Sequence, residues 1–302
     1  MDKNNLLTIE NKILKFLKTD IKQRFIDARQ AIGIVLENAE ALIEQDELYD
    51  PIVDIDEIES NLRVGEMLEE LLLELLPGSL VVERDTFSRQ IFCKMKNHQY
   101  IWVVAPLDGR KAFRDLENTE YSVGIALLMD LDPIFSVVYA PELKTDYGKG
   151  TCVSANKYVD GVCANGKEIF DKAVGKPQMF TSHIDKDHAR NRVESQIARM
   201  FKKSETIFAH DGHSTLVQYM FVALNINEKS FSRRDANVWD VAAGGYLVIK
   251  NNGSVFYPYR SNIFPIDIDL LTFSRNHLFM PLNVACNKPT RDMICKVFVP
   301  GM

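Results

Sequence analysis

The arrangement of apolar residues changes at Pro77-Gly78, and this change limits the fold more than any other feature of the sequence. Before this point apolar residues recur every three or four positions, from Ile9 to about Ile43 and again from Val64 to Leu76, which predicts amphipathic helices. After it come short runs rich in β-branched and aromatic residues, which predict strands: Leu80–Val82, Gln90–Met95, Tyr100–Val104, Ser122–Met129 and Ile134–Tyr139. Taken alone, these patterns predict a mixed α/β chain.

The breaks between the predicted helices are marked by proline and by capping residues. Asp50-Pro51 predicts a loop, because proline and the residue before it disfavour a continuing helix. Ser60 or Asn61 is predicted to cap the next helix, since short polar side chains accept hydrogen bonds from a first helical turn. That helix is predicted to end at Pro77-Gly78.

A second mixed half is predicted to follow the first, with the division between residues 1–165 and residues 166–302. No internal repeat and no low-complexity linker separates the two, so we expect them to share a tight interface. The second half contains predicted helices at Val193–Phe201, His213–Leu224 and Val238–Lys250, and predicted strands at Ile207–Ala209, Ser254–Tyr257 and Leu282–Cys286.

The composition is that of an ordinary globular protein, because 46% of the 302 residues are hydrophobic and 26% are charged. No apolar run approaches the roughly 18 residues needed to cross a bilayer, and the first residues lack the pattern of a secretory signal. The five cysteines are scattered without a Cys-x-x-Cys pair, which argues against a disulfide framework or a structural zinc site. We therefore expect a cytoplasmic protein without a membrane partner.

The formal net charge of −6 argues against a broad nucleic-acid surface. The charge is unevenly distributed, because Glu37 to Asp85 holds 16 acidic residues against Arg63 and Arg84 alone, which leaves +8 for the rest of the chain. A basic remainder suits a small anionic ligand. A solvated acidic helix face with scattered lysines explains the same counts, and a partner-binding role for the acidic stretch is a third interpretation.

Two segments carry residues typical of functional sites. Trp102–Arg110 is an apolar strand that ends in a Pro-x-Asp-Gly turn and places Asp108 at a strand end, where α/β folds hold their chemistry. Ala236–Gly245 places Asp240 in the first turn of a helix rich in alanine and glycine. Each segment alone also fits a common turn or a helix start.

Together the two segments resemble the signature motifs of the inositol monophosphatase family, the magnesium-dependent, lithium-sensitive phosphatases related to fructose-bisphosphatase. The resemblance covers most of the chain. Further segments that resemble the family are Ala28–Gly33, Asn61 through Pro77, Ser79–Glu83, Asp132–Pro141, Ala164–Lys167 and Asn252–Val255. The resemblance implies an α/β fold, a layered αβαβα sandwich, and it implies a homodimer for many members.

The resemblance also implies a metal site, because the family holds Mg²⁺ ions with oxygen ligands around a phosphate. Glu83, Asp108 and Asp240 stand at ligand positions, and the carbonyl of Leu107 matches another. The backbone N–H groups of Gly109 and Arg110 are then expected to face the phosphate, so that Asp108, Gly109 and Arg110 form the phosphate-binding segment.

Three positions depart from the family pattern. Ala105 replaces an aspartate that bridges two metals, and Arg110 replaces a threonine or serine that orients the attacking water. Asn61 replaces the aspartate that pairs with that hydroxyl. Because Mg²⁺ needs carboxylates to hold it, these changes predict weak metal binding, and Arg110 can instead contact a phosphate with two hydrogen bonds.

The departures leave two functions open. One is a pseudoenzyme that binds a small phosphorylated molecule with little or no hydrolysis. The other is an active phosphomonoesterase with a reduced metal site, acting on an inositol, sugar or nucleotide phosphate. Arg233, at a substrate-contacting position of the family, is expected to shape the pocket for an anionic ligand, unless it pairs with a surface carboxylate such as Asp235.

Three other groups of residues give weaker signals. Cys286 and Arg291 are one residue too close for the loop of cysteine-dependent phosphatases. His210 and His213 lack a specific metal-ligand pattern, and we interpret them as structural or surface residues. Asp85 lies two residues after Glu83, where a continuing strand would present it on the same face as a substitute carboxylate.

Overall fold

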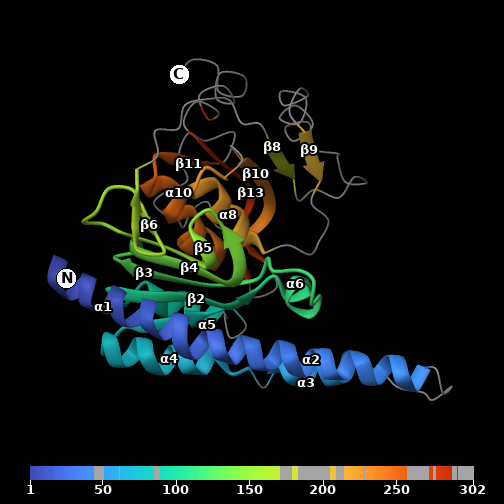
Figure 1. Cartoon of the computed structure of the whole chain (residues 1–302). Helices are drawn as coiled ribbons and strands as arrows, with labels where there is room; N and C mark the ends of the chain where they lie inside the picture. The colour runs from blue at the N-terminus through green and yellow to red at the C-terminus, as the bar shows by residue number, and fades with distance from the viewer. Residues whose placement is uncertain are drawn as a thin grey trace.

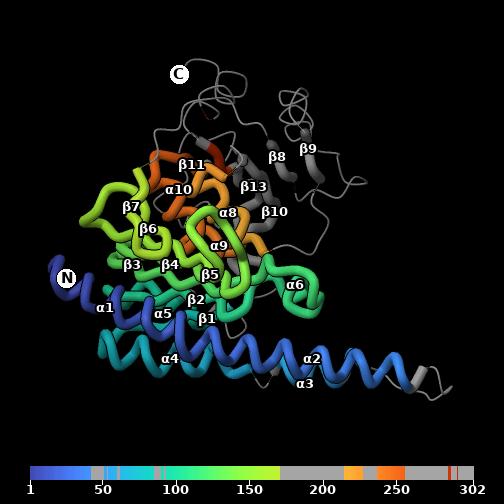
Figure 2. Tube along the Cα trace, viewed as in Figure 1, coloured from blue at the N-terminus to red at the C-terminus, as the bar shows by residue number. Residues whose placement is uncertain are grey.

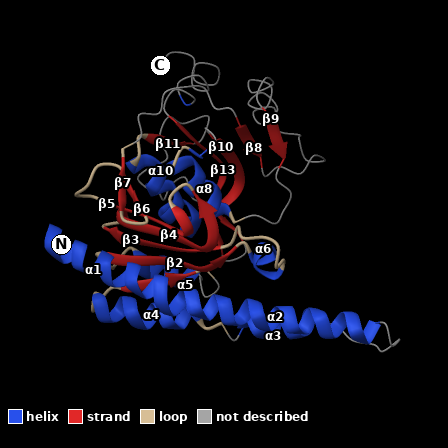
Figure 3. Ribbon diagram, viewed as in Figure 1, coloured by secondary structure: helices blue, strands red, loops and turns tan. Residues whose placement is uncertain are grey.

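The structure is a computed structural model of the chain, and it describes residues 1–43, 51–60, 62–84, 89–170, 179–182, 205–208, 214–226, 229–256, 272–274, 277–287 and 291 (Figures 1 and 2). Helices and sheets alternate in layers (Figure 3). The N-terminal helices cover one face of a first sheet, and a second group of helices covers its other face and separates it from a second sheet.

A long helical segment opens the chain, as the periodicity predicts. It comprises α1 (Lys3–Phe16), a π-helical turn η1 (Leu17–Ile21) and α2 (Lys22–Ile43). Asp2 caps α1, because its side chain accepts a hydrogen bond from the backbone N–H of Asn5 at 2.8 Å. Ile13, Ile21 and Phe25 of the predicted stripe are fully buried.

The next helix, α3 (Pro51–Ser60), was not predicted, and the helix after it differs from the prediction at its start. α3 begins at Pro51 itself, because proline is well tolerated in the first helical position, where its missing N–H has no partner to lose. α4 (Val64–Leu75) has Arg63 at its N-cap, in a left-handed conformation with φ of 51°, so neither Ser60 nor Asn61 is the N-cap of this helix. Asn61 itself lies outside the described residues.

The first sheet contains seven strands in the described residues, and they follow the chain order. The β1 and β2 strands are parallel, and each later neighbouring pair is antiparallel. The strands are β1 (Leu80–Glu83), β2 (Tyr100–Asp108), β3 (Ser122–Met129), β4 (Asp132–Thr145), β5 (Gly148–Asn156), β6 (Val162–Ala164) and β7 (Lys167–Ile169). The predicted strand at Gln90–Met95 is wrong, because this segment forms helix α5 (Arg89–Met95), which is the crossover that a parallel pair needs.

Short helices lie next to the two motif segments, Trp102–Arg110 and Ala236–Gly245. After β2 comes α6 (Arg110–Arg114), and the second helix layer contains α8 (Thr215–Ala223), α9 (Val238–Asp240), a π-helical turn η4 (Val241–Gly245) and α10 (Tyr246–Lys250). These confirm the helices predicted at His213–Leu224 and Val238–Lys250. Gly244 lets η4 approach α8 closely, since a Cβ there would lie 2.5 Å from the Cβ of Tyr219.

The second sheet has the order β11-β13-β10-β8-β9 in the described residues, with β12 paired to β13. Its strands are β8 (Met179–Ser182), β9 (Glu205–Phe208), β10 (Lys229–Asn237), β11 (Gly253–Phe256), β12 (Thr272–Ser274) and β13 (His277–Asn287). The strands predicted near Ile207, Ser254 and Leu282 are present in it. The helix predicted at Val193–Phe201 lies outside the described residues.

Two apolar cores lie on opposite faces of the first sheet. Trp102 and Val104 of β2 pack with α1, α2 and α4 in one core. Val103 and Ala105 point to the other face and pack with α8, α9 and α10. Alternate residues of β2 therefore serve different cores, as a strand buried on both faces requires. Among the described residues, no helix is both long and apolar enough to span a bilayer.

Candidate functional site

Asp108 lies at the end of β2 and is hydrogen-bonded to the start of α8. Its Oδ2 atom accepts a hydrogen bond from Ser214 Oγ at 2.6 Å and another from the backbone N–H of Leu216 at 2.9 Å. The residue is 7% exposed. This carboxylate therefore compensates the positive N-terminal end of α8, in addition to any role toward a ligand.

Ser214 links three elements through one hydroxyl. It caps α8 by accepting a hydrogen bond from the N–H of Val217 at 3.1 Å, and its Oγ lies 2.8 Å from Ser122 Oγ on β3. Both serines are fully buried. Buried polar groups are costly unless paired, so this network fixes the end of β2 against β3 and α8.

The second oxygen of Asp108 faces a cation. Arg84 Nη1, just after β1, lies 3.8 Å from Asp108 Oδ1. The carboxylate is thus contacted by protein groups on both oxygens, which leaves it a weaker donor to a metal ion than a carboxylate that faces solvent.

Gly109 makes the turn from β2 into α6 possible. Its φ of 83° lies in the left-handed region, and a Cβ there would lie 2.7 Å from the carbonyl oxygen of Glu120 and 3.0 Å from Ser214 Cβ. Both the conformation and the close approach require glycine. The turn places Arg110 in the first turn of α6, where the side chain is exposed.

Ala105 is fully buried, and its backbone pairs with Gly124 of β3. The strand register shifts between Ala105 and Asp108, which changes the direction of the chain just before the motif ends. A methyl group at this position supplies no oxygen. The residue at the bridging position is therefore part of the apolar core.

A cavity of about 710 Å³ lies beside this turn. Three of the predicted site residues line it, namely Glu83, Leu107 and Arg110. The rest of its lining combines acidic, basic and apolar side chains of α3, α4 and their neighbours: Asp56, Glu59, Leu62, Arg63, Val64, Gly65, Glu66, Pro106 and Arg114. The space is large enough for a small phosphorylated molecule.

Glu83 lies against the first turn of α4. A Cβ at Gly65 would lie 2.3 Å from Glu83 Oε1, so the absence of a side chain at Gly65 makes room for the carboxylate. Because Glu83 ends a strand parallel to β2, the two strand ends meet at one edge of the sheet, as the prediction requires.

Arg114 is held by two carboxylates of α3. Its Nε and Nη2 atoms donate to Glu59 at 2.7 and 2.8 Å, and Nη2 also pairs with Asp56. The hydrogen bonds to Glu59 raise the pKa of the guanidinium further above its ordinary value. The ion pairs therefore close one wall of the cavity by joining α6 to α3.

The remaining predicted residues lie elsewhere or outside the described part. Asp240 is 2% exposed and acts in a capping box, in which its Oδ2 accepts a hydrogen bond from the N–H of Asn237 at 3.3 Å. The backbone of Arg233 lies in β10 opposite Asn283, and its side chain is outside the described residues. Cys286 is buried on β13. The positions of Asp85, His210 and His213 lie outside the described residues as well.

The donor set does not match a multi-metal centre. Within the described residues, no three His, Cys, Asp or Glu side chains lie close enough together to hold one metal ion. Asp108 accepts hydrogen bonds from α8, Asp240 accepts one in the capping box, and Ala105 has no donor atom. The residues as they lie do not fit the two or three Mg²⁺ ions of the family's chemistry.

Several residues of this region were missed by the sequence patterns. Ser214 carried a local signal, because a serine directly before an apolar helix is a typical N-cap. The contacts of Arg84 with Asp108 and of Arg114 with Glu59 carried none, because each joins residues far apart in the sequence.

Comparison with known proteins identifies the family and the fold. Residues 17–289 match the sequence model of the Inositol monophosphatase family. Among curated proteins it is similar to the 3'(2'),5'-bisphosphate nucleotidase CysQ of Salmonella typhimurium, with 26% identity over 151 residues, 50% of this chain and 56% of that protein. CysQ of Escherichia coli is 27% identical over 48% of this chain and 54% of its own length. The chain thus spans about half the length of the curated relatives it matches.

Solved structures with the same fold cover nearly the whole chain. The suhB protein of Bartonella henselae superposes with a TM-score of 0.65 at 16% identity, over 98% of this chain and 99% of its own. A Staphylococcus aureus protein, SaIMPase-II with bound inositol monophosphate, gives a TM-score of 0.63 at 16% identity, over 95% and 94% of the two chains. These similarities confirm the predicted layered α/β fold, and with the family match over most of its length the chain belongs to the inositol monophosphatase family.

Proposed function

We propose that this chain binds a small phosphorylated ligand in the cavity beside β2 and α6, with little or no metal-dependent hydrolysis. The observation that carries the proposal is the state of Asp108. Both its oxygens are contacted by protein groups, from Ser214 and Leu216 on one side and from Arg84 on the other. A carboxylate held by these contacts stabilises the fold and is less available to bind a metal ion.

Arginine side chains in the lining of the cavity support the binding of an anion. Arg63, Arg110 and Arg114 line it, and Arg110 occupies the final position of the motif. A guanidinium can contact a phosphate with two parallel hydrogen bonds. Four acidic residues also line the cavity. Asp56 and Glu59 pair with Arg114, and Glu66 pairs with Arg63, so these charges largely offset one another. The proposal therefore depends on Arg110.

The test is a titration of the purified protein with inorganic phosphate and a set of phosphomonoesters, with and without Mg²⁺. We expect binding that does not require Mg²⁺, and phosphate release far below the typical enzymatic range of about 1–1,000 per second. Binding should weaken roughly tenfold in Arg110→Met, because a charge-assisted contact to the anion is lost.

The neighbouring Lys111 provides a matched control. It lies on the same helix and is exposed, but it does not line the cavity. Lys111→Met removes the same charge and should leave phosphate affinity unchanged. Equal losses in both variants would mean that only the overall charge matters, and the proposed site would be wrong.

A second function is favoured by the similar proteins. The curated relatives are bisphosphate nucleotidases, one structural neighbour holds 2'AMP and another holds Mg²⁺ and phosphate. The alternative is therefore an active phosphomonoesterase on an inositol, sugar or nucleotide phosphate, with Glu83, Asp108 and Asp240 as a reduced ligand set. Mg²⁺-dependent phosphate release at an ordinary enzymatic rate, abolished by Asp108→Asn, would establish it and refute the binding-only proposal.

A further inference from the structure

We propose that Arg29 of α2 is a positioning residue for the ligand site, because it holds the end of α6 in place. The inference rests on the proposed function, in which α6 supplies Arg110 and Arg114 to the cavity. Arg29 is 7% exposed and does not line the cavity. It therefore acts through α6 and not by contact with the ligand.

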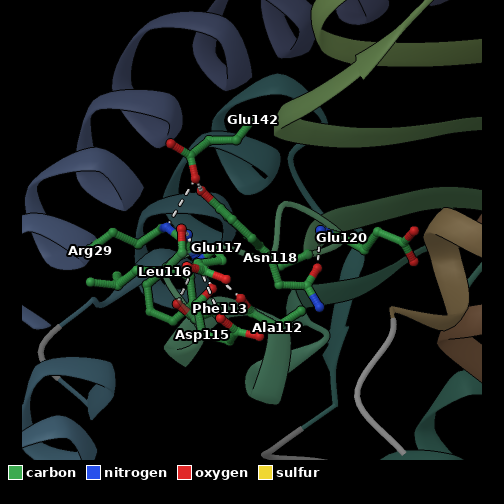
Figure 4. A network of polar contacts seen from close by, with 10 residues as sticks. Arg29, Ala112, Phe113, Asp115, Leu116, Glu117, Asn118, Glu120 and Glu142 are labelled. Carbon is green, nitrogen blue, oxygen red and sulfur yellow. Dashed lines mark hydrogen bonds and ion pairs between the residues drawn. The ribbon is translucent and has the colours of Figure 1, made fainter. Parts of the chain in front are cut away.

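Four backbone carbonyls at the end of α6 accept hydrogen bonds from Arg29 (Figure 4). Nη1 donates to the oxygens of Ala112 and Phe113 at 3.1 and 2.8 Å. Nη2 donates to those of Asp115 and Leu116 at 3.2 and 2.7 Å. The last carbonyls of a helix have no partner within it, so Arg29 supplies partners to the carbonyls at the end of α6. The Asp115 carbonyl in the following turn also accepts a hydrogen bond from the N–H of Asn118 at 2.9 Å.

The fifth donor of the guanidinium is paired as well. Nε lies 2.9 Å from Glu142 Oε2 on β4, and the same oxygen accepts a hydrogen bond from Tyr121 at 3.1 Å. The guanidinium also lies over the Tyr121 ring, 5.0 Å from its centroid. Since arginine has five N–H donors in one plane, every donor has an acceptor here, and Glu142 neutralises the buried charge.

Because α6 is short, the contacts of Arg29 at its end also fix the position of Arg110 in the cavity lining. The helix has five residues, so its two ends are only about 7.5 Å apart at 1.5 Å per residue. A shift at Phe113 is therefore expected to move Arg110, because less than one helical turn separates them. Arg114 adds a second attachment to α3 through Glu59.

Lysine cannot replace arginine in this position. Its ammonium has three donors at a single point, whereas the carbonyls and Glu142 are reached by a planar fork. Arg29→Lys thus keeps the charge and removes the geometry, which makes it the informative variant.

The experiment measures α6 and the ligand site separately in Arg29→Lys. Hydrogen exchange reports on the peptide that spans residues 109–121. In this peptide the N–H of Phe113 donates a hydrogen bond to the carbonyl oxygen of Gly109, and the N–H of Asp115 donates one to that of Lys111. Titration with inorganic phosphate reports on the cavity. We expect faster exchange in this peptide and phosphate affinity lower by roughly 10- to 100-fold, the range observed when the hydrogen-bonding partner that orients a metal ligand is removed.

Glu10→Gln is a control of similar burial. Glu10 of α1 is also 7% exposed, and it accepts hydrogen bonds from Ser154 and Asn156 on β5 at 2.7 and 2.8 Å. This network lies away from α6. The variant should lower the melting temperature yet leave phosphate affinity and exchange over residues 109–121 at wild-type levels.

The outcomes separate the inference from the proposed function. If Arg29→Lys lowers the melting temperature as Glu10→Gln does, with unchanged phosphate affinity and unchanged exchange, the inference is wrong. If the wild-type protein binds no phosphate, the proposed function fails, and exchange over residues 109–121 alone decides whether Arg29 positions α6. Should Arg29→Lys not fold, Glu142→Gln is measured in its place, because the buried guanidinium is held less firmly at the carbonyls once its neutralising carboxylate is removed. Unchanged exchange and unchanged phosphate affinity in that variant would also overturn the inference.

Discussion

Asp108 shows how a single side chain can belong to the fold and to a predicted site at once. Its Oδ2 atom stabilises the start of α8 through Ser214 and Leu216, and its Oδ1 atom faces Arg84. If Asp108 served only as a metal ligand, removing its side chain would raise the stability of the metal-free protein or leave it unchanged. The two roles therefore predict opposite effects of its removal on stability.

Asp108→Ala should lower the free energy of unfolding by about 3 kcal/mol, because the buried Leu216 N–H loses its acceptor and the Ser214 hydroxyl keeps only Ser122 Oγ as a partner. Urea unfolding without added metal measures this. Asp132, an exposed aspartate at the start of β4, is the comparison, and Asp132→Ala should change stability by less than about 0.5 kcal/mol. An Asp108→Ala protein as stable as the wild type would show that the hydrogen bonds to α8 contribute nothing.

At the scale of elements, α6 is held from two sides. Arg29 attaches its end to α2, and Arg114 attaches it to α3 through Glu59 and Asp56. The five-residue helix has too few internal hydrogen bonds to be stable alone. Its position beside the cavity thus depends on contacts with neighbouring helices.

The two carboxylates that bind Arg114 should contribute unequally. Glu59 makes two hydrogen bonds and its side chain is 9% exposed, whereas that of Asp56 is 59% exposed. Glu59→Ala should cost about 2 kcal/mol of stability, because Arg114 loses its better-buried partner. Asp56→Ala should cost no more than about 0.5 kcal/mol, since solvent screens that pair. Thermal unfolding of both variants tests this prediction. Equal losses of stability would contradict the conclusion that Glu59 makes the main contact between α3 and Arg114.

At the scale of the whole molecule, ionisable groups are buried in both cores. Burial raises the pKa of the Cys152 thiol from 9.0 to about 12. It also raises the pKa of the Tyr121 and Tyr139 hydroxyls in the same core and of Tyr246 in the other. In each case the neutral form is the one that the folded state favours.

The free energy of unfolding should therefore fall as the pH rises above about 9, because the unfolded chain loses these protons first. The contribution of Cys152 is complete below its unfolded pKa of 9.0 and is lost as the pH approaches about 12. Urea midpoints at about pH 8 and pH 10.5 measure the loss. Cys152→Ala should reduce it, while Cys93→Ala, which alters an exposed cysteine, should not. A loss that is the same in all three proteins would exclude a contribution from Cys152.

The expected division of the chain at residue 165 and the expected homodimer remain proposals. The described strands of the first sheet run from Leu80 to Ile169, and those of the second sheet lie in residues 179–287. The turn between β6 and β7 lies at the proposed division, so the first sheet continues a few residues past it.

The sequence pattern alone predicted those helices and strands that are buried in the same way along their whole length. The stripe from Ile9 to Ile32 is buried along one side of its helices, and the run at Ser122–Met129 is buried along nearly its whole length. Their patterns alone therefore predicted helix and strand. Gln90–Met95 was predicted wrongly, because a short apolar run fits either structure and only its place as the crossover between β1 and β2 made it a helix. Pro51 was misplaced for a related reason, since proline ends one helix and begins another equally well.

The sequence by itself also determined the family resemblance, the strand end that carries Asp108, and the absence of a carboxylate at Ala105. Only the tertiary structure decided what Asp108 contacts, which residues line the cavity, and that Arg29 holds α6 across more than 80 positions of the chain. The physical reason is that motifs record residue types and spacing along the chain. A hydrogen bond to a backbone carbonyl leaves no trace in the identity of its acceptor, and it exists only once the layers have packed.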